Sequence, residues 1–183
     1  DIDNVPDTPS LITAYNNRLF FVDPTNPNRI FFSDLGDYET YSLNSFLYAS
    51  PPKSSDHITG WRVFQDNLVV FTKESKYAIN EQGGGISTVS INQSIGTKGA
   101  VSDEAMAVDK NGIWFMADDK QVYFYNGISD KLISLDVEPE LTSILNTDSV
   151  TFHLYNNHLR IYYAKGASTF ANRMLLYDIE QKQ

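Results

Sequence analysis

The sequence predicts an all-β protein, a β-propeller-like array of about four antiparallel blades that forms part of a larger propeller. The first reason is composition, because 11 Tyr and 11 Phe stand against 3 Met, and aromatic side chains favour the pleated surface of a sheet. The second reason is a repeat in which a turn with Asn precedes a short aromatic strand. Its markers Asn17, Asn67, Asn111 and Asn157 lie 50, 44 and 46 residues apart, and a period in the forties is typical of propeller blades.

The repeat divides the chain into units. Residues 1–9 are expected to form an N-terminal extension, and residues 10–183 the propeller repeats, at about 10–50, 57–99, 100–146 and 148–183. The last unit is expected to be truncated, since no final strand is predicted in it. Blades bury their faces against neighbours, so four of them form a small open arc or belong to a larger ring. Both ends of the sequence suggest a piece of a longer protein.

The first unit predicts three strands, over residues 11–15, 18–22 and 29–33. Asn16 and Asn17 predict a type I′ hairpin turn between the first two strands, because Asn tolerates a positive φ angle. Residues 23–28 predict a loop from their Pro and Asn content, and residues 33–37 predict a turn.

The later units follow the same scheme after a boundary loop at 51–56. The second unit predicts four strands, over residues 58–64, 67–72, 75–80 and 86–91, with a flexible turn at 83–85. The third unit predicts four strands, over residues 105–108, 113–117, 122–125 and 131–135. One or two helical turns are expected within 137–145, where Pro139 stands early and apolar residues share one face. The fourth unit predicts three strands, over residues 150–155, 159–164 and 173–179.

Charge and composition exclude several classes of function. The net charge of −9 and the pI near 4.6 argue against a general phosphate-binding surface, which needs clustered Lys and Arg. The absence of Cys excludes disulfides and thiolate metal sites. No apolar run reaches the roughly 20 residues that cross a bilayer, so no membrane association is expected.

No motif indicates a reaction, and we expect no catalytic, cofactor-binding or metal-binding residue. His57, His153 and His158 lack the local spacing of metal ligands. Acidic residues gather at turns, where they most simply accept hydrogen bonds from local backbone groups; these are Asp34, Asp37, Asp103, Glu104, Asp118 and Asp119. Trp61 and Trp114 fall on predicted strands, which indicates core positions more than sugar-stacking positions.

One stretch is more specific than these features. Residues 17–21 read N-R-L-F-F and residues 27–37 read P-N-R-I-F-F-S-D-L-G-D. This order resembles tailed-bacteriophage virion proteins with propeller repeats, and it is similar to the family of podovirus-type tail hub and packaged-DNA stabilisation proteins. Further pieces fit the same pattern, at residues 67–79, 91–99, 112–115 and 122–127. The resemblance extends from about residue 11 to residue 179, through short and mostly structural motifs.

The resemblance implies a structural role in the virion and no enzymatic activity. Proteins of this family lie below the portal or along the tail, oligomerise around the tail axis and help to plug or extend the DNA channel. The implied partners are the portal, tail subunits and further copies of the chain, with genomic DNA passing nearby without specific binding. Relatives are several hundred residues long, so this chain would be one part of such a protein.

Two other classes stay open. A carbohydrate- or receptor-binding propeller of a virion tail would use surface Trp and Tyr, and a glycosidase-type propeller would need convergent carboxylates in a cleft. In each case we expect the contacts to come from the long loops at 23–28 and 165–172, since loops carry contacts while strands hold the scaffold. The candidate contact residues are Asp23, Asn26, Asn28, Lys165, Thr169 and Asn172.

Overall fold

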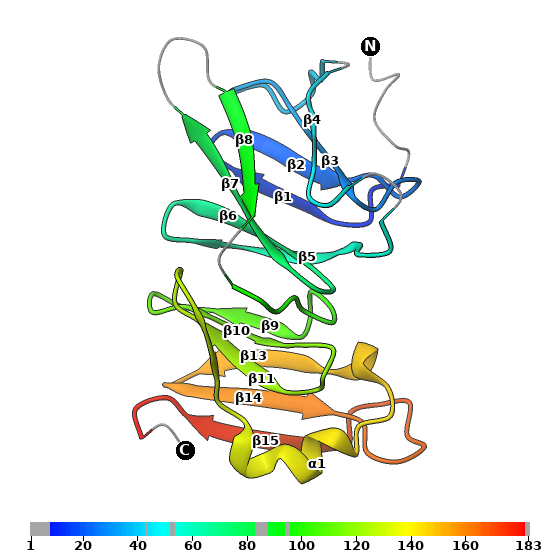
Figure 1. The fold of residues 1–183 in the computed structure, drawn as a ribbon, viewed down its shortest axis with the longest axis vertical. Coiled ribbons are helices and arrows are strands. Elements are labelled where there is room, and N and C mark those ends of the chain that lie inside the picture. Colours follow the sequence, from blue (N-terminus) through cyan, green and yellow to red (C-terminus); the bar gives the residue numbers. More distant parts are fainter. Residues whose placement is uncertain (1–7, 43, 52–53, 83–87, 94–95, 182–183) are drawn as a thin grey trace.

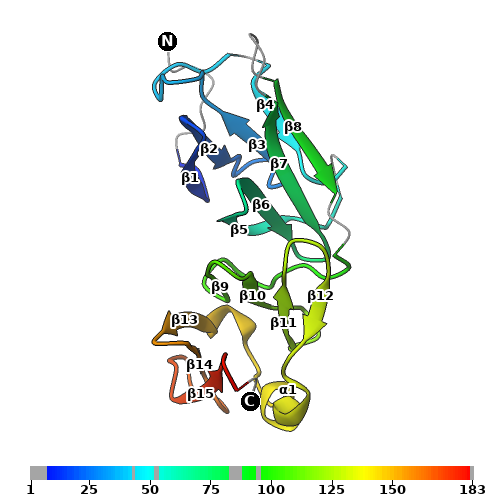
Figure 2. The ribbon, with the colours of Figure 1, turned by 90° about the vertical axis from the view of Figure 1, so that its left-hand side faces the viewer.

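The chain folds into four antiparallel β-sheets that follow one another along the sequence (Figure 1). This computed structural model describes residues 8–42, 44–51, 54–82, 88–93 and 96–181. Within each sheet, strands that are consecutive in sequence are hydrogen-bonded neighbours. Figure 2 shows the sheets spaced along the long axis of the molecule, with β1–β8 in one half and β9–β15 in the other. The described sheets are open and none closes into a barrel, and the predicted all-β class is confirmed at this level.

The first sheet contains β1 (Ile12–Tyr15), β2 (Arg18–Val22), β3 (Arg29–Phe32) and β4 (Phe46–Tyr48). Asn16 and Asn17 join β1 to β2 with φ angles of 50° and 57°, which confirms the predicted turn with two positive φ angles. Strand β4 is absent from the prediction, because three consecutive apolar residues show no alternation that would mark a strand.

The second sheet contains β5 (Ile58–Phe64), β6 (Asn67–Thr72), β7 (Lys76–Gln82) and β8 (Thr88–Gln93). Its first turn consists of Gln65 and Asp66, with φ angles of 49° and 57°, so Asn67 is the first residue of β6. The alignment of Asn67 with Asn17 is therefore wrong by one residue. Because side chains alternate between the two faces of a strand, this slip would exchange the faces of the sheet. The predicted turn at 83–85 lies outside the described residues.

The third sheet contains β9 (Met106–Val108), β10 (Ile113–Met116), β11 (Val122–Tyr125) and β12 (Asp130–Leu132). The 3-10 turn η1 (Leu135–Val137) and the helix α1 (Glu138–Thr142) follow, and Pro139 occupies the first turn of α1, where a missing N–H costs nothing. The predicted helical turns are confirmed. In the described part of the chain, no helix is long and apolar enough to cross a membrane.

The fourth sheet has three strands within the described residues. After the 3-10 turn η2 (Thr147–Ser149), it contains β13 (Thr151–Tyr155), β14 (His158–Tyr163) and β15 (Arg173–Asp178). Asn156 and Asn157 join β13 to β14 with φ angles of 48° and 61°, which repeats the turn of the first sheet. Each of the four sheets falls within one of the four expected units.

Buried apolar side chains form three clusters, one between each pair of successive sheets. The first cluster includes Phe20, Val22, Trp61, Leu68 and Val70. The second includes Val69, Phe71, Met106, Ile113 and Phe115. The third includes Trp114, Met116, Phe152, Leu159 and Ile161. Because alternate residues of β6 and β10 enter different clusters, the second and third sheets bury both of their faces.

Ion pairs join the sheets inside this stack. Arg18 of the first sheet contacts Glu81 of the second at 3.1 Å. Lys76 of the second sheet has a fully buried side chain whose Nζ lies 2.8 Å from Asp130 Oδ2 of the third. The rings of Phe71, Phe115 and Tyr125 surround this ammonium, at 4.8–5.6 Å from Nζ to each centroid. Burial lowers the pKa of Lys76, and Asp130 opposes that shift.

Candidate interaction site between the third and fourth sheets

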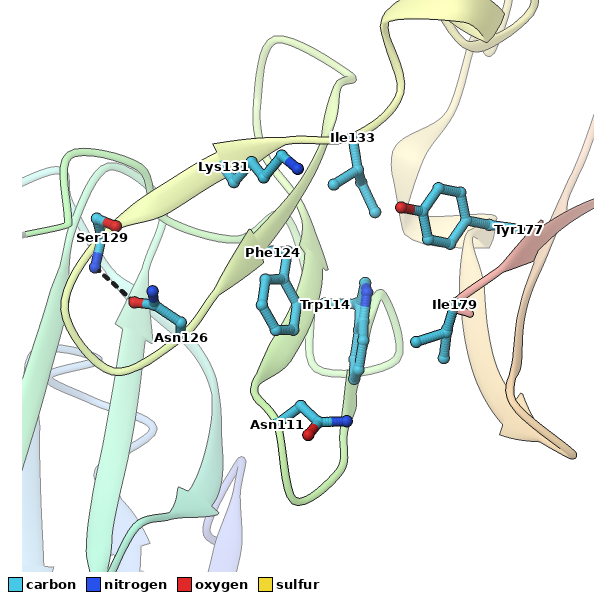
Figure 3. Close-up of a pocket in the computed structure, with 9 residues that line it drawn as sticks. All are labelled: Asn111, Trp114, Phe124, Asn126, Ser129, Lys131, Ile133, Tyr177 and Ile179. Carbon is cyan, nitrogen blue, oxygen red and sulfur yellow. Dashed lines mark hydrogen bonds between the residues drawn. The ribbon is translucent and has the colours of Figure 1, made fainter. Parts of the chain in front are cut away.

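The main cavity lies where the outer parts of the third and fourth sheets diverge. Its volume is about 570 Å³. Figure 3 shows Trp114 and Phe124 of the third sheet facing Tyr177 and Ile179 across the opening. Ile133 completes the apolar wall, and polar residues complete the lining, namely Asn111, Asn126, Ser129 and Lys131. An apolar wall with a few polar groups at its rim is the usual composition of a binding pocket.

Strand pairing positions the aromatic wall. Trp114 of β10 pairs directly with Phe124 of β11, and their ring centroids lie 4.7 Å apart with the planes tilted by 47°. On the fourth sheet, Tyr177 of β15 pairs with Leu159 of β14. Trp114 is only 2% exposed, whereas Phe124 and Tyr177 are half-buried, so a ligand would meet mainly the latter two rings. Burial raises the pKa of Tyr177.

The rim is shaped by a hydrogen-bonded turn. Asn126 Oδ1 accepts bonds from the backbone N–H groups of Ile128 and Ser129, both at 2.9 Å, and Figure 3 shows the second of these bonds. Asn111 donates from Nδ2 to Asp109 Oδ2 at 3.1 Å. Lys131 is exposed at the rim. The rim therefore has fixed amide groups and one cationic side chain.

A smaller cavity of about 80 Å³ extends the site along β15. It shares Ile133 and Tyr177 with the main cavity, and it is also lined by Leu175, Leu176 and Val137 of η1. The two cavities together form a groove between the end of β12 and β15. We call this feature the β12–β15 groove.

The predicted contact loop at 23–28 turns two of its side chains inward. Asp23 is 2% exposed, and its carboxylate accepts bonds from Thr25 N and Oγ1 at 2.8 and 2.7 Å and from the Arg29 guanidinium. Burial alone would raise the pKa of Asp23, but the bonds from Thr25 and Arg29 outweigh it and hold the pKa below its usual value. Asn28 is also buried, and its Nδ2 donates to Ser54 O at 3.1 Å.

Asn26 remains half-exposed beside a cavity of about 230 Å³ that His57 also lines. Its backbone closes the loop, since its N–H donates to Asp23 O at 3.2 Å and its C=O accepts from Arg29 N at 2.8 Å. The loop at 23–28 thus has an ordered backbone and presents Asn26 outward.

The predicted contact loop at 165–172 is exposed. Lys165 Nζ bonds both carboxylate oxygens of Glu140, at 2.9 and 2.8 Å, and Asn172 Oδ1 accepts from Lys165 N at 2.9 Å. Thr169 is exposed. The neighbouring Phe170 is not among the predicted contact residues, yet it is 81% exposed. Its signal in the sequence is that it is the one aromatic residue in the polar loop at 165–172.

Four separate strands hold the side chains of His153, His158, Trp61 and Trp114. His158 Nε2 lies 3.8 Å from Asp178 Oδ2, whereas His153 projects from β13. Trp61 and Trp114 are 5% and 2% exposed, which places both in the core as the sequence indicated. Across the described ranges, no group of three or more His, Cys, Asp or Glu residues could hold a metal ion.

No family model and no curated protein matches this sequence. Among solved structures, the chain is similar to the computationally designed protein Ika8, with 14% identity and a TM-score of 0.51 over 94% of this chain and 46% of that one. It also matches a chain in the structure of S. cerevisiae Dbp5 bound to Nup159, Gle1, IP6 and ADP, with 11% identity and a TM-score of 0.48 over 96% of this chain and 48% of that one. The chain thus spans slightly less than half the length of each matched chain.

Proposed function

We propose that this chain is a structural component of a bacteriophage tail or head–tail connector. Its four sheets are blades of a larger β-propeller, and it acts through protein–protein contacts around the DNA channel instead of catalysing a reaction. Its partners are the portal, other tail subunits and further copies of itself, and its location is the virion. The phage assignment is based on the sequence resemblance, and the contact role is based on the terminal sheet.

The main support comes from comparing the same face in two sheets. Phe71 of β6 pairs with Lys76 of β7, and both side chains are fully buried against the third sheet. The corresponding pair in the fourth sheet, counted from the hairpin turn, is Tyr162 with Met174. Met174 is 49% exposed, because no further sheet of the described chain covers it. The fourth sheet therefore offers an uncovered copy of an inter-sheet contact surface.

Further apolar side chains enlarge this surface. Tyr155 and Leu176 are 52% and 54% exposed, and Leu176 pairs with Arg160 on the same face as Met174. Exposed apolar residues grouped on a sheet face commonly mark a contact with another protein. In the proposed virion, a further blade or subunit covers this face.

The propeller assignment is supported by the repeated stacking of the sheets. Each buried cluster lies between successive sheets, as expected of blades that bury their faces against their neighbours.

The net negative charge of the chain supports a role in which DNA passes the protein without binding to it. With a net charge of −9, a channel wall of this protein would repel the phosphate backbone and allow DNA to slide. We expect no retention of duplex DNA in a mobility-shift assay at low salt. Binding that weakens as salt is added would contradict this part of the proposal.

The virion role can be tested by mass spectrometry of purified phage particles whose genome encodes this sequence. We expect peptides of the chain in tail-bearing particles, in a fixed ratio to the portal protein. Absence from the particles would refute the role. A glycan array provides the control for the alternative class, because specific sugar binding would favour a receptor-binding tail protein.

A further inference from the structure

Among the ion pairs that Lys side chains form in the described chain, the pair of Lys76 with Asp130 is the most deeply buried. The two side chains are 0% and 6% exposed, and Lys76 Nζ lies 2.8 Å from Asp130 Oδ2. Lys76 is the first residue of β7 and Asp130 the first residue of β12, and 54 positions separate them in the sequence. A covalent bond between these side chains would therefore join the second sheet to the third.

The surroundings of Lys76 favour an uncharged amine. Its side chain is fully buried, and the rings of Phe71, Phe115 and Tyr125 lie around Nζ. Charges without solvent are costly in such surroundings, so the ammonium can transfer a proton to the carboxylate and leave a neutral amine beside a neutral acid. Burial outweighs the attraction of Asp130 and lowers the pKa of Lys76. A desolvated, neutral Lys side chain is a nucleophile.

The two carboxyl oxygens of Asp130 differ in their contacts. Oδ2 accepts N–H bonds from the backbone of Thr97 and Lys98, at 3.0 and 3.3 Å. Oδ1 is buried and has no hydrogen-bond partner in the part of the chain that the structure describes. Two backbone N–H groups on one oxygen stabilise the negative charge that develops there when a nucleophile attacks the attached carbon. Oδ2 is therefore placed to hold that charge, and Oδ1 to leave.

The amine is held close to the carbon that it would attack. Because a carbon–oxygen bond of this kind is about 1.2 Å long, Asp130 Cγ lies within about 4 Å of Lys76 Nζ. The carbonyl oxygen of Lys98 accepts an N–H bond from Nζ at 2.5 Å, which helps to fix the amine. A Cβ at Gly96 would overlap the Lys76 side chain, so the backbone of Gly96 also confines it. Reacting groups that are well oriented reach effective concentrations of about 10⁵ M or more.

We propose that Lys76 and Asp130 join in an isopeptide bond that links the second sheet covalently to the third. Nζ attacks Cγ, and Oδ2 carries the negative charge of the tetrahedral intermediate. Overall, two protons pass from the ammonium to Oδ1, the Nζ–Cγ bond forms, the Cγ–Oδ1 bond breaks, and Oδ1 leaves as water. The step balances without an oxidant or a further reactant. It does not rest on the virion role, because all the groups that react belong to this chain.

Two exposed ion pairs of the same chain are matched controls. Lys98 with Asp119 and Lys165 with Glu140 have the same contact of 2.8 Å between nitrogen and oxygen, but their side chains are 33–41% exposed. Water solvates both charges at these pairs, so the amines stay protonated. We expect no covalent bond at either pair.

The test is the intact mass of the purified chain, followed by peptide mapping. We expect a form that is lighter than the sequence mass by one water molecule. Chain that has folded but not reacted keeps the ion pair, so the lighter form should accumulate while the folded protein is incubated at neutral pH. A tryptic digest should then contain residues 74–98 joined to residues 121–131, without cleavage at Lys76, because trypsin needs a free Lys side chain. Lys76→Met should keep its full sequence mass.

The unsubstituted chain tests the proposal directly, whether or not Lys76→Met folds. The full sequence mass after prolonged incubation of the folded chain would overturn it. Loss of water without joined peptides would also overturn it, because that result indicates cyclisation of a single Asp residue. Equal linkage of Lys98 to Asp119 would show that burial does not select the reacting pair, and would contradict the reasoning in the same way.

Discussion

Replacing Asp130 with Ala should destabilise the whole fold, because it leaves the buried Lys76 ammonium without its counter-charge. Lys76 Nζ lies 2.8 Å from Asp130 Oδ2 and 2.5 Å from the carbonyl oxygen of Lys98. Asp130 Oδ2 also accepts N–H bonds from Thr97 and Lys98, at 3.0 and 3.3 Å. Removal of one partner from a buried ion pair costs about 3–5 kcal/mol, and the two lost backbone bonds place the expected loss toward the upper part of that range.

A double-mutant cycle separates the ion pair from the packing around it. Lys76→Met removes the charge and keeps an apolar side chain among the rings of Phe71, Phe115 and Tyr125. The free energy of unfolding should be measured by urea denaturation for both single variants and for the double variant. We expect the double variant to lose about 1–3 kcal/mol less than the sum of the single losses, because contacting residues couple by that amount.

The pH dependence gives a second measure of the same pair. Burial lowers the pKa of Lys76 from its ordinary value of 10.5, so between the lowered pKa and 10.5 the unfolded chain binds more protons than the folded chain. In that range the free energy of unfolding of the native sequence should rise with pH relative to that of Lys76→Met. A loss below about 1 kcal/mol for Asp130→Ala, as for an exposed ion pair, together with additive losses would refute the reasoning.

Three further changes test local features of the fold. Gln65→Asn combined with Asp66→Gly should raise the free energy of unfolding by about 0.5–1 kcal/mol in urea denaturation, because these residues adopt positive φ angles at less cost; a loss would contradict the assigned turn. Asp23→Asn should destabilise the fold at neutral pH but not in acid, since the stabilising carboxylate bonds are lost as pH falls through its lowered pKa; an equal effect at every pH in a denaturation series would contradict this. Gly99→Ala should lower the melting temperature and cost about 1–3 kcal/mol, because a Cβ there would overlap the backbone of Thr72; an unchanged melting temperature would contradict that packing.

Local residue chemistry explains the parts of the fold that the sequence predicts well. The Asn pairs at 16–17 and 156–157 tolerate positive φ angles, and both form the expected two-residue turns. Gln65 and Asp66 form the same turn, in which Asp66 is of a type that tolerates a positive φ angle and Gln65 is not. An alignment of the repeats on their Asn residues uses Asn67 as the marker of this turn. Asn67 is the first residue of β6 and donates from Nδ2 to Gln65 O at 2.7 Å. The alignment is wrong by one residue because Asn67 stabilises the turn from the first position of β6 and does not lie within the turn itself.

The candidate site was less predictable, because it depends on how separate sheets meet. Trp114 and Phe124 are correctly predicted as strand residues. Nothing in the sequence indicates that a cavity lies beside the wall that they form. Within the described residues the fourth sheet has three strands and each of the other sheets has four, and the opening lies between the third and fourth sheets. The groove between β12 and β15 also depends on the register that pairs Tyr177 with Leu159. That register depends on contacts between distant parts of the chain.

The loops show a related limit of sequence reasoning. Asp23 and Thr169 both lie in polar, Asn-containing loops and were equally good candidates for contacts. The structure buries the Asp23 carboxylate under Thr25 and Arg29, while Thr169 stays exposed. Which polar side chains face inward is decided by a specific arrangement of donors, and composition does not reveal it.

The most direct test of an assembly role is the mass of the purified chain in solution, measured by light scattering on a sizing column over a range of concentrations. We expect a multiple of 20.7 kDa that is reduced to the monomer when Met174 and Leu176, on the uncovered face of the fourth sheet, are both replaced by Lys. A monomer of 20.7 kDa at every concentration would contradict self-assembly through that face.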